Sequence, residues 1–395
     1  MPDLSTTTVV ALIKVAVCIG LLMTAAAYFV LLERWMAAWI QMRRGPNRVG
    51  IPLSKIKLFG LGQPMADGIK FIFKEEYTPA HVDRPLFLLA PITVLTAALA
   101  TFAVVPFGSV LGQVDGVEQR IELVVAPGID VGMIYVFALG SIAVYGVILG
   151  GWASNNKYSF LGAMRSTAQL ISYELPLGLG ILGVVLATGS LRLEEIINAQ
   201  ADSGLWFAFT QPLGLLVFSV AAFAEAARLP FDLPECEQEL IGGYHTEYSG
   251  IKLLLFLVAE FLHMIAASFL IVILFFGGWH LPFGLTGSGD EIGWGTAIVR
   301  IVALMVKITL MILFFMLVRW SWPRFRFDQL MSLAWKVMLP LGLVNLVAVA
   351  FVYEFEASPL LHVAIGWTVA VGGWIIAALA TPQIADNTPR REAAT

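Results

Sequence analysis

Nine stretches of the chain are apolar and long enough to cross the hydrocarbon core of a bilayer as helices. A spanning helix needs about 20 mostly apolar residues, because each residue advances about 1.5 Å through a core about 30 Å thick. Only 13 % of the residues are charged, against about 25 % in soluble domains. The sequence therefore predicts an all-α, polytopic integral membrane protein with a single transmembrane domain over residues 1–395. The nine predicted spans are residues 9–32, 85–105, 131–152, 169–187, 205–227, 251–276, 297–318, 333–352 and 360–380.

Basic residues are distributed unevenly between the two sets of connections, and this predicts the orientation. The connections on one side, together with the C-terminal tail, carry 19 Lys and Arg residues, whereas those on the other side carry three. Lys and Arg accumulate on the cytoplasmic side of membrane proteins. We therefore expect the N-terminus outside and the C-terminus in the cytoplasm. The first loop (33–84) and the acidic loop (228–250) should both lie on the cytoplasmic side.

Cysteine and histidine usage argues against a metal or redox group bound by this chain. Cys18 and Cys236 are far apart, and the five histidines are scattered, whereas zinc sites and iron–sulfur clusters use grouped ligands. We expect no metal site, so any electron transfer takes place on other chains. A net charge of −4 also gives no electrostatic basis for a nucleic-acid partner.

The first cytoplasmic-side loop contains a predicted amphipathic helix over residues 60–76. Asp67, Lys70 and Lys74 recur at helical spacing, and apolar residues occupy the rest of the helix. Such a helix is typical of segments that lie in the membrane interface. The alternative is an ordinary solvated helix that only connects two spans.

Several ionisable residues fall inside the predicted spans. They are Glu174, Glu225, Glu260, His263 and Lys307. An ionisable group near the bilayer centre costs about 2.5–3.5 kcal/mol on insertion scales, so it should face protein or water. One such residue alone is explained by a structural hydrogen bond. Three carboxylates and a lysine in consecutive spans, all assigned to the inner half of the membrane, favour a path for protons or ions.

The loop RLPFDLPECEQELIGGYHTEY (228–248) concentrates carboxylates on the side of the membrane that is otherwise basic. A capped, solvated surface helix would account for them. However, Glu225 lies just before this loop and Glu260 lies in the span after it. We therefore predict that the acids line a route from the loop into the membrane. The carboxylates of the loop are Asp232, Glu235, Glu237, Glu239 and Glu247.

Five stretches of the chain together resemble a known family. They are LLERWMAAWIQMRRGPNRVG (31–50), GLGQPMADGIKFIFKE (60–75), AQLISYELPLGLG (168–180), PFDLPECEQELIGG (230–243) and RWSWPRFRFDQLMSLAWK (319–336). They resemble the H-subunit family of NADH-quinone oxidoreductase, the membrane subunit of respiratory complex I at the junction with the peripheral arm. The resemblance runs from about residue 9 to 352, so the ninth span and the tail (353–395) lie outside it.

The resemblance implies a quinone chamber and a proton path, with residues that match position by position. The residues implied for the quinone chamber are Glu33, Arg34, Asp67, Lys70, Arg319, Arg324 and Arg326. Those implied for the proton path and its coupling are Glu174, Glu225, Asp232, Glu235, Glu237, Glu247 and Glu260. Trp35, Phe261 and His263 depart from the residues that are common in the family.

The resemblance also implies a function for the chain. It would be a non-redox subunit of a proton-translocating NADH-quinone oxidoreductase, with a quinone such as ubiquinone as substrate and no complete active site of its own. Its partners would be the lipid bilayer, the peripheral-arm subunits of the quinone site and neighbouring small membrane subunits. NADH, flavin and iron–sulfur clusters would belong to partner subunits. The location would be a prokaryotic inner membrane rather than an organellar one.

Two other functions remain open from the sequence. A homologous membrane subunit of a proton-pumping, membrane-bound hydrogenase would keep the chain of acids without needing a quinone. An autonomous secondary transporter would also place charges in the membrane. Transporters usually show paired repeats and broken helices at mid-membrane, and no such pair is found in this sequence. An apolar interfacial helix favours the quinone, because an isoprenoid tail needs an apolar slot.

Overall fold

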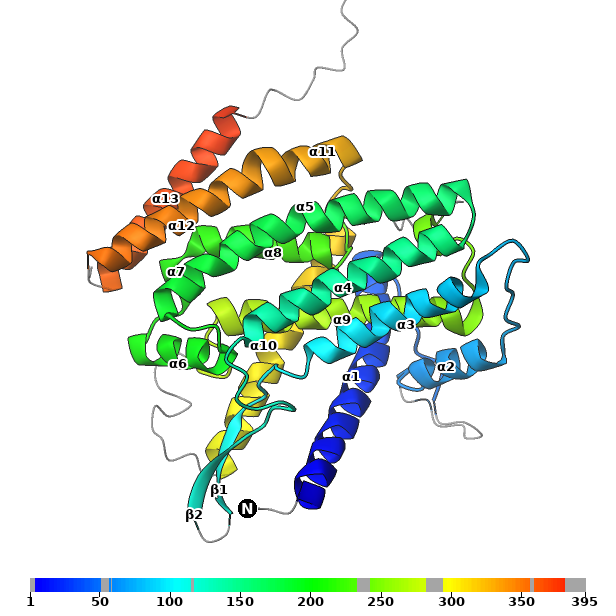
Figure 1. Cartoon of the computed structure of the whole chain (residues 1–395), viewed down its shortest axis with the longest axis horizontal. Coiled ribbons are helices and arrows are strands. Elements are labelled where there is room, and N and C mark those ends of the chain that lie inside the picture. The colour runs from blue at the N-terminus through cyan, green and yellow to red at the C-terminus, as the bar shows by residue number, and fades with distance from the viewer. Residues whose placement is uncertain are drawn as a thin grey trace, which may run out of the picture.

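Figure 1 shows the computed structural model of the chain, in which helices form nearly all of the regular structure. The structure describes residues 4–50, 57, 59–114, 117–232, 242–281, 294–355 and 359–380. The helices of the nine apolar segments are α1 (Leu4–Ile40), α3 (Arg84–Thr101), α4 (Gly132–Ala153), α5 (Lys157–Thr188), α8 (Pro212–Glu225), α9 (Gly250–Phe275), α10 (Trp294–Ser321), α12 (Leu339–Glu354) and α13 (Pro359–Ala380). The prediction of an all-α, multi-pass membrane protein is confirmed.

The number of spans is not confirmed as nine. Among the described residues, seven helices are long and apolar enough to cross a membrane, and α8 and α13 are not among them. Helix α8 has 14 residues, which extends it over only about 21 Å. The seventh of these long helices joins α11 (Phe327–Ser332), the π-helical turn η3 (Leu333–Met338) and α12.

Shorter elements occupy the connections between the long helices. They are α2 (Gln63–Phe73), α6 (Leu193–Ser203), α7 (Phe207–Thr210) and the 3-10 turn η1 (Gly243–His245). A two-stranded antiparallel hairpin, β1 (Ser109–Val114) and β2 (Val117–Glu122), pairs Ser109 with Glu122 and Val114 with Val117. We did not predict this hairpin, although the Asp-Gly pair at 115–116 in the sequence is a typical hairpin signal.

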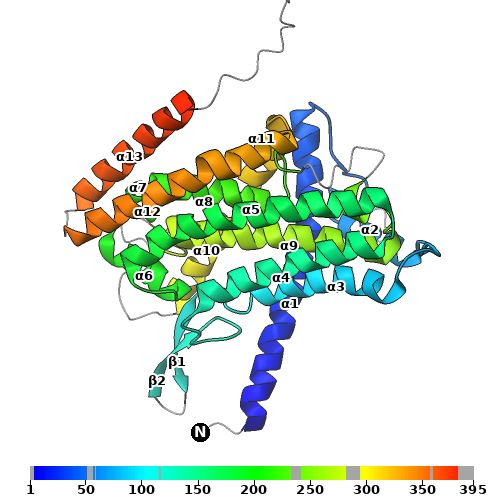
Figure 2. The same cartoon turned by 45° about the horizontal axis from the view of Figure 1, so that its top comes forward.

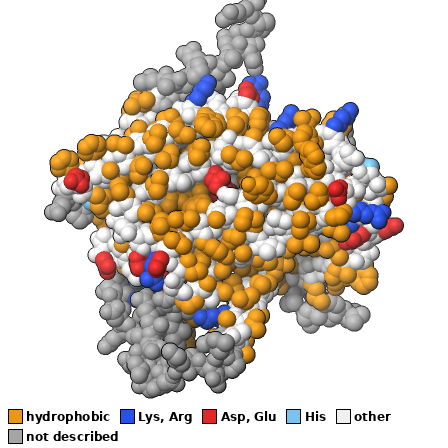
Figure 3. Space-filling model, viewed as in Figure 1, with side chains coloured by type: hydrophobic (Ala, Val, Ile, Leu, Met, Phe, Trp, Pro, Cys, Tyr) orange, Lys and Arg blue, Asp and Glu red, His pale blue; other side chains and the backbone are white. Residues whose placement is uncertain are grey.

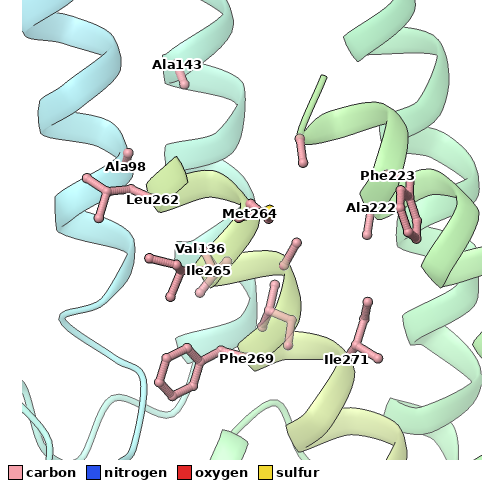
Figure 4. Packing of buried hydrophobic residues seen from close by; sticks show 14 of the residues in the cluster. Ala98, Val136, Ala143, Ala222, Phe223, Leu262, Met264, Ile265, Phe269 and Ile271 are labelled. Atoms are coloured by element: carbon pink, nitrogen blue, oxygen red, sulfur yellow. The ribbon is translucent and has the colours of Figure 1, made fainter. Parts of the chain in front are cut away.

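Helix α9 is the centre of the bundle. It packs against α3, α8 and α10, while α5 packs against α4, α8 and α12. Figure 4 shows Leu262, Ile265 and Phe269 of α9 on the side of α3 and α4, and Phe269 forms edge contacts with Phe102 and Phe107. In contrast, Figures 1 and 2 show the N-terminal part of α1 standing away from the bundle.

Small residues let neighbouring helices approach closely, as is typical of membrane bundles. A Cβ added to Gly146 of α4 would lie 2.4 Å from Val94 of α3, and one added to Gly151 would lie 2.2 Å from Ala163 of α5.

The outer surface is apolar instead of polar. Figure 3 shows hydrophobic side chains over most of one face, with few charged side chains, as expected for a surface that faces lipid.

Candidate functional site

Three carboxylates and a histidine meet at one cavity within the bundle. Glu174 of α5, Glu225 at the end of α8, and Glu260 and His263 of α9 line a space of about 60 Å³. We call this space the acid cavity. A cavity volume of about 10–15 Å³ is enough to hold one water molecule. The acid cavity therefore has room for a few waters. The predicted gathering of the intramembrane carboxylates is thus seen in the structure, and His263 joins them.

Helix α4 supplies the wall that positions two of these acids. The hydroxyl of Ser141 donates a hydrogen bond to the Glu174 carboxylate. One residue earlier, a Cβ added to Gly140 would lie 2.9 Å from Oε1 of Glu225. A larger residue at position 140 would therefore push this carboxylate away. Sequence reasoning missed both residues, although small and polar residues next to each other in an apolar span often mark a helix–helix contact.

The C-terminal end of the acidic loop closes the acid cavity. Tyr244 of η1 lines the cavity. The preceding residue, Gly243, lies so close to α5 that a Cβ added to Gly162 would come within 2.7 Å of its Cα. Glu247 does not line the cavity and instead accepts a 2.6 Å hydrogen bond from the Asn156 side chain.

The loop is anchored further by Tyr248, which stacks on Phe87 of α3 and donates a hydrogen bond to the Phe87 carbonyl. Burial raises the pKa of Tyr248 above its usual value, because the charged phenolate would lose its solvation. The hydroxyl therefore remains a donor at any physiological pH.

A second set of charged side chains lies where α1, the loop after α8 and the end of α10 meet. We call it the ion-pair cluster. Glu33 of α1 accepts a hydrogen bond from Arg319 of α10, and Arg228 lies 3.5 Å from its other oxygen. Arg324 approaches Asp232 to 3.5 Å. These pairs bring together three guanidinium groups and two carboxylates. Among the described residues, the cluster therefore holds one more guanidinium group than carboxylates.

Arg228 is the member of this cluster that the sequence-based assignment left out. It is only 4 % exposed, and its guanidinium carbon lies 4.3 Å from the centre of the Phe261 ring. Within the described part of the chain, Nε and Nη2 of Arg228 have no hydrogen-bond partner. The signal that could have found it is the presence of a single arginine beside five carboxylates in the loop, since a buried arginine needs such partners.

The predicted interfacial helix forms as α2, although it is shorter than residues 60–76. Its residue Asp67 makes a 2.5 Å ion pair with Arg34 at the end of α1, and Gln63 donates to the other oxygen of Asp67. Its apolar side chains are exposed, with Phe73 at 84 % and Ile72 at 65 %. An exposed apolar face beside a membrane bundle suits contact with lipid or with a lipid-like tail.

Two residues assigned to the quinone chamber, Lys70 and Arg326, join neither the acid cavity nor the ion-pair cluster. Lys70 on α2 is exposed. Arg326 is exposed and pairs locally with Asp328 at 3.2 Å, so it does not join Arg324 in the ion-pair cluster. Glu235 and Glu237 lie outside the described residues.

Lys307 requires a correction, because its sequence position groups it with the acids of the inner half. Its ammonium group donates to the carbonyls of Phe276, Gly278 and His280 at 2.8, 2.9 and 2.6 Å, in the turn that follows α9. The far end of α9 thus holds it away from the acid cavity, and it caps a helix C-terminus.

In the part of the chain that the structure describes, no group of three His, Cys, Asp or Glu residues could hold a metal ion.

Comparisons with known proteins place this architecture in a family. The family model described as NADH dehydrogenase matches residues 13–350. The H subunit of NADH-quinone oxidoreductase from Protochlamydia amoebophila is 46 % identical over 83 % of this chain and 93 % of its own length. The chain belongs to the H-subunit family of NADH-quinone oxidoreductase. An H subunit from Cytophaga hutchinsonii is 45 % identical over 82 % of this chain and 90 % of the relative. A further H subunit, from Geobacter metallireducens, is 45 % identical over 86 % of this chain and 95 % of the relative.

The acid cavity and the ion-pair cluster both lie within the region that this family match covers. The match begins at residue 13, before Glu33, and ends at residue 350, after Arg326. Helix α13 begins at Pro359 and therefore lies beyond the matched region. The resemblance to the H-subunit family, predicted from five short stretches, is thus confirmed over most of the chain.

Proposed function

We propose that this chain forms the quinone-binding chamber of a proton-translocating NADH-quinone oxidoreductase and couples quinone reduction to a carboxylate-lined proton path. The acid cavity carries this proposal. Glu174, Glu225 and Glu260 share a space large enough for water. Carboxylates positioned around a water-sized space are groups that can accept protons from water and pass them on.

The ion-pair cluster and α2 support the quinone half of the proposal. An isoprenoid quinone needs an apolar entrance for its tail and polar groups for its headgroup. The exposed apolar face of α2 provides the first, and the ion pair between Arg34 and Asp67 fixes this helix to α1. Glu33, Arg228 and Arg319 would provide an electrostatic environment in which negative charge on a reduced quinone is stabilised.

The proposed function requires partner chains. The relatives are named as H subunits of NADH-quinone oxidoreductase, and a subunit of this kind works beside peripheral-arm and small membrane subunits. NADH, flavin and iron–sulfur clusters would reside on those partners. This chain would contribute binding, charge and proton transfer, in the inner membrane of a prokaryotic cell with its N-terminus outside and its C-terminus in the cytoplasm.

Replacement of the cavity carboxylates tests the proposal. Glu174→Gln, Glu225→Gln and Glu260→Gln preserve size but remove the proton-carrying group. Each should lower quinone-dependent NADH oxidation and proton uptake in membrane vesicles by about tenfold or more, because a positioned proton-transfer group is typically worth about 10²–10⁴ in rate. Assembly should persist, as judged by the subunits that co-purify.

Glu195→Gln is the matched control. This carboxylate is exposed, pairs with Arg192 at 3.2 Å and does not line the acid cavity, so its loss should leave both rates unchanged. If all three cavity variants kept the wild-type rate and proton yield, the acid cavity would be structural and the proposed path would be wrong.

A further inference from the structure

Another cavity, of about 580 Å³, lies where α3, α4 and α5 end on one side of the bundle. We call it the interface cavity. Figures 1 and 2 show the start of α3, the end of α4 and the start of α5 on this side. The acidic loop ends here too, since the side chain of Asn156, which lines the cavity, donates to Glu247 at 2.6 Å. Sites for small organic ligands have volumes of about 300–1,000 Å³, so the interface cavity has room for an organic headgroup.

Hydrogen bonds between the chain segments build the wall of the interface cavity. The backbone amide of Asp83 donates to the carbonyl of Ala153 at 3.0 Å, which joins the start of α3 to the end of α4. The side chain of Asn155 donates to the carbonyl of His81, also at 3.0 Å. Asp83, Ala153, Asn155 and His81 all line the cavity. The same contacts that join the helix ends therefore shape the cavity.

Aromatic side chains place the interface cavity at the edge of the hydrocarbon core. Trp152, in the last turn of α4, and Phe160, in the first turn of α5, both line it, and their ring centres lie 5.8 Å apart. The neighbouring Tyr158 is exposed, and Trp152 is 64 % exposed. Trp and Tyr gather at the level of the lipid headgroups, where their rings face the apolar core and their polar atoms face water. The cavity is therefore expected to open at headgroup level.

One acidic and one basic side chain line the interface cavity. They are Asp83 and Lys157, and both are exposed. Asp83 is the N-cap residue of α3, but its side chain makes no capping hydrogen bond. Among the ion pairs of the described residues, none includes Asp83 or Lys157. A ligand that matches this pair of charges carries one anionic and one cationic group.

We propose that the interface cavity binds the headgroup of an aminophospholipid, with the phosphate at Lys157 and the primary ammonium group at Asp83. Asp83 would repel a headgroup that carries only negative charge. A quaternary ammonium headgroup has no N–H to donate to the carboxylate, whereas a primary ammonium group forms a charge-assisted hydrogen bond. One acyl chain can follow the face of α4 that carries Trp152 and, seven residues earlier, Tyr145, which is also exposed.

The lipid site is separate from the acid cavity. Among the described residues, none lines both cavities, so a failure of the proposed proton path leaves the lipid site standing. A bound headgroup would nevertheless touch Asn156, which holds Glu247 at the end of the acidic loop. The lipid would therefore support the connection that positions this part of the loop.

Photo-crosslinking of the purified complex, with its co-purifying subunits, tests the lipid site. The complex is washed with detergent to remove retained lipid and reconstituted into phosphatidylcholine vesicles. Three parallel samples contain a trace of phosphatidylethanolamine, phosphatidylcholine or phosphatidylglycerol, each with the same photoreactive acyl chain. Phosphatidylethanolamine should label the segment 145–160 about fivefold more strongly than the other two lipids, which is the upper range for one surface ion pair.

Two single substitutions separate the two halves of the headgroup. Asp83→Asn keeps a good N-cap residue and should lower phosphatidylethanolamine labelling to the level of phosphatidylcholine, because the contact with the ammonium group is lost. Lys157→Gln should lower labelling by both lipids, because both carry the phosphate. Lys74→Gln and Glu75→Gln are the matched controls. These exposed residues do not line the cavity, and their loss should leave the labelling unchanged.

Three results would overturn the proposal. Equal labelling by the three lipids would mean that the headgroup is not recognised. Stronger labelling by phosphatidylglycerol would mean that the cavity selects negative charge alone. No label on the segment 145–160 in the assembled complex would mean that a partner chain, and not a lipid, covers the cavity.

Discussion

Glu33→Gln should destabilise the protein far more than Asp67→Asn does. The second change breaks the ion pair of Arg34, the residue that follows Glu33 in the sequence. Glu33 and Arg34 are neighbours at the end of α1, but they point to different environments. The side chains of Glu33 and Arg228 are 9 % and 5 % exposed, whereas those of Arg34 and Asp67 are 45 % and 26 % exposed. The same amide substitution in the two pairs therefore tests whether burial sets the energy.

The size of the difference follows from the geometry. At the 3.5 Å separation of Arg228 and Glu33, the Coulomb attraction is about 5 kcal/mol for an effective dielectric constant of about 20. Desolvation offsets much of it, but removal of one partner leaves the other charge buried, which costs about 3–5 kcal/mol. Loss of an exposed pair such as Arg34 with Asp67 costs about 0–1 kcal/mol.

Thermal unfolding at one fixed scan rate is the suitable assay, because membrane proteins often unfold irreversibly. Glu33→Gln should lower the melting temperature several-fold more than Asp67→Asn does. The double variant Glu33→Gln with Arg319→Gln should lose less than the sum of the two single variants, since it removes one of the uncompensated charges. Equal shifts for Glu33→Gln and Asp67→Asn would refute the argument that burial controls this cluster.

Two further predictions concern the quinone entrance and the topology. Ala66→Trp on α2 should raise the apparent quinone KM or block turnover without dissociating the complex, because the ring would obstruct a quinone tail that enters beside α2. An unchanged KM in an assembled complex would exclude α2 as a wall of the proposed chamber. Cysteines introduced at Ser5 and Thr395 should be labelled from opposite sides of the membrane. The 19 to 3 distribution of basic residues predicts that the N-terminus lies outside and the C-terminus lies in the cytoplasm. Labelling from one side would remove α13 from the set of spans.

Most of the fold could be predicted because apolar runs and helix length obey simple rules. Every one of the nine runs forms a helix, since the backbone of a chain in lipid must satisfy its own hydrogen bonds. The number of spans could not be predicted in the same way, because a run such as 205–227 contains Pro212. Helix α7 ends at Thr210 and α8 begins at Pro212, so this apolar run forms two helices and not one long helix.

The site was predictable in part, because intramembrane charge is costly and so is informative. Glu174, Glu225 and Glu260 were found from their position in apolar runs, and the structure places them around one cavity. Lys307 obeyed the same rule and was misplaced, since hydropathy shows depth but not the direction in which a side chain points. Gly140 was missed because its contribution is the absence of a side chain, which only the approach of the Glu225 carboxylate to α4 reveals.

The acid cavity and the ion-pair cluster are joined by one short stretch of chain, and we propose that this stretch couples them. Glu225 lines the acid cavity, and Arg228 enters the ion-pair cluster only three residues later. The buried side chain of Gln169 on α5 donates to the carbonyls of Ala224 and Phe231, at 3.0 and 2.8 Å. It thereby fixes both ends of the stretch to one helix. In this proposal, a movement of Arg228 toward new negative charge at the cluster would change the backbone within this stretch, beside Glu225, because Gln169 holds both of its ends.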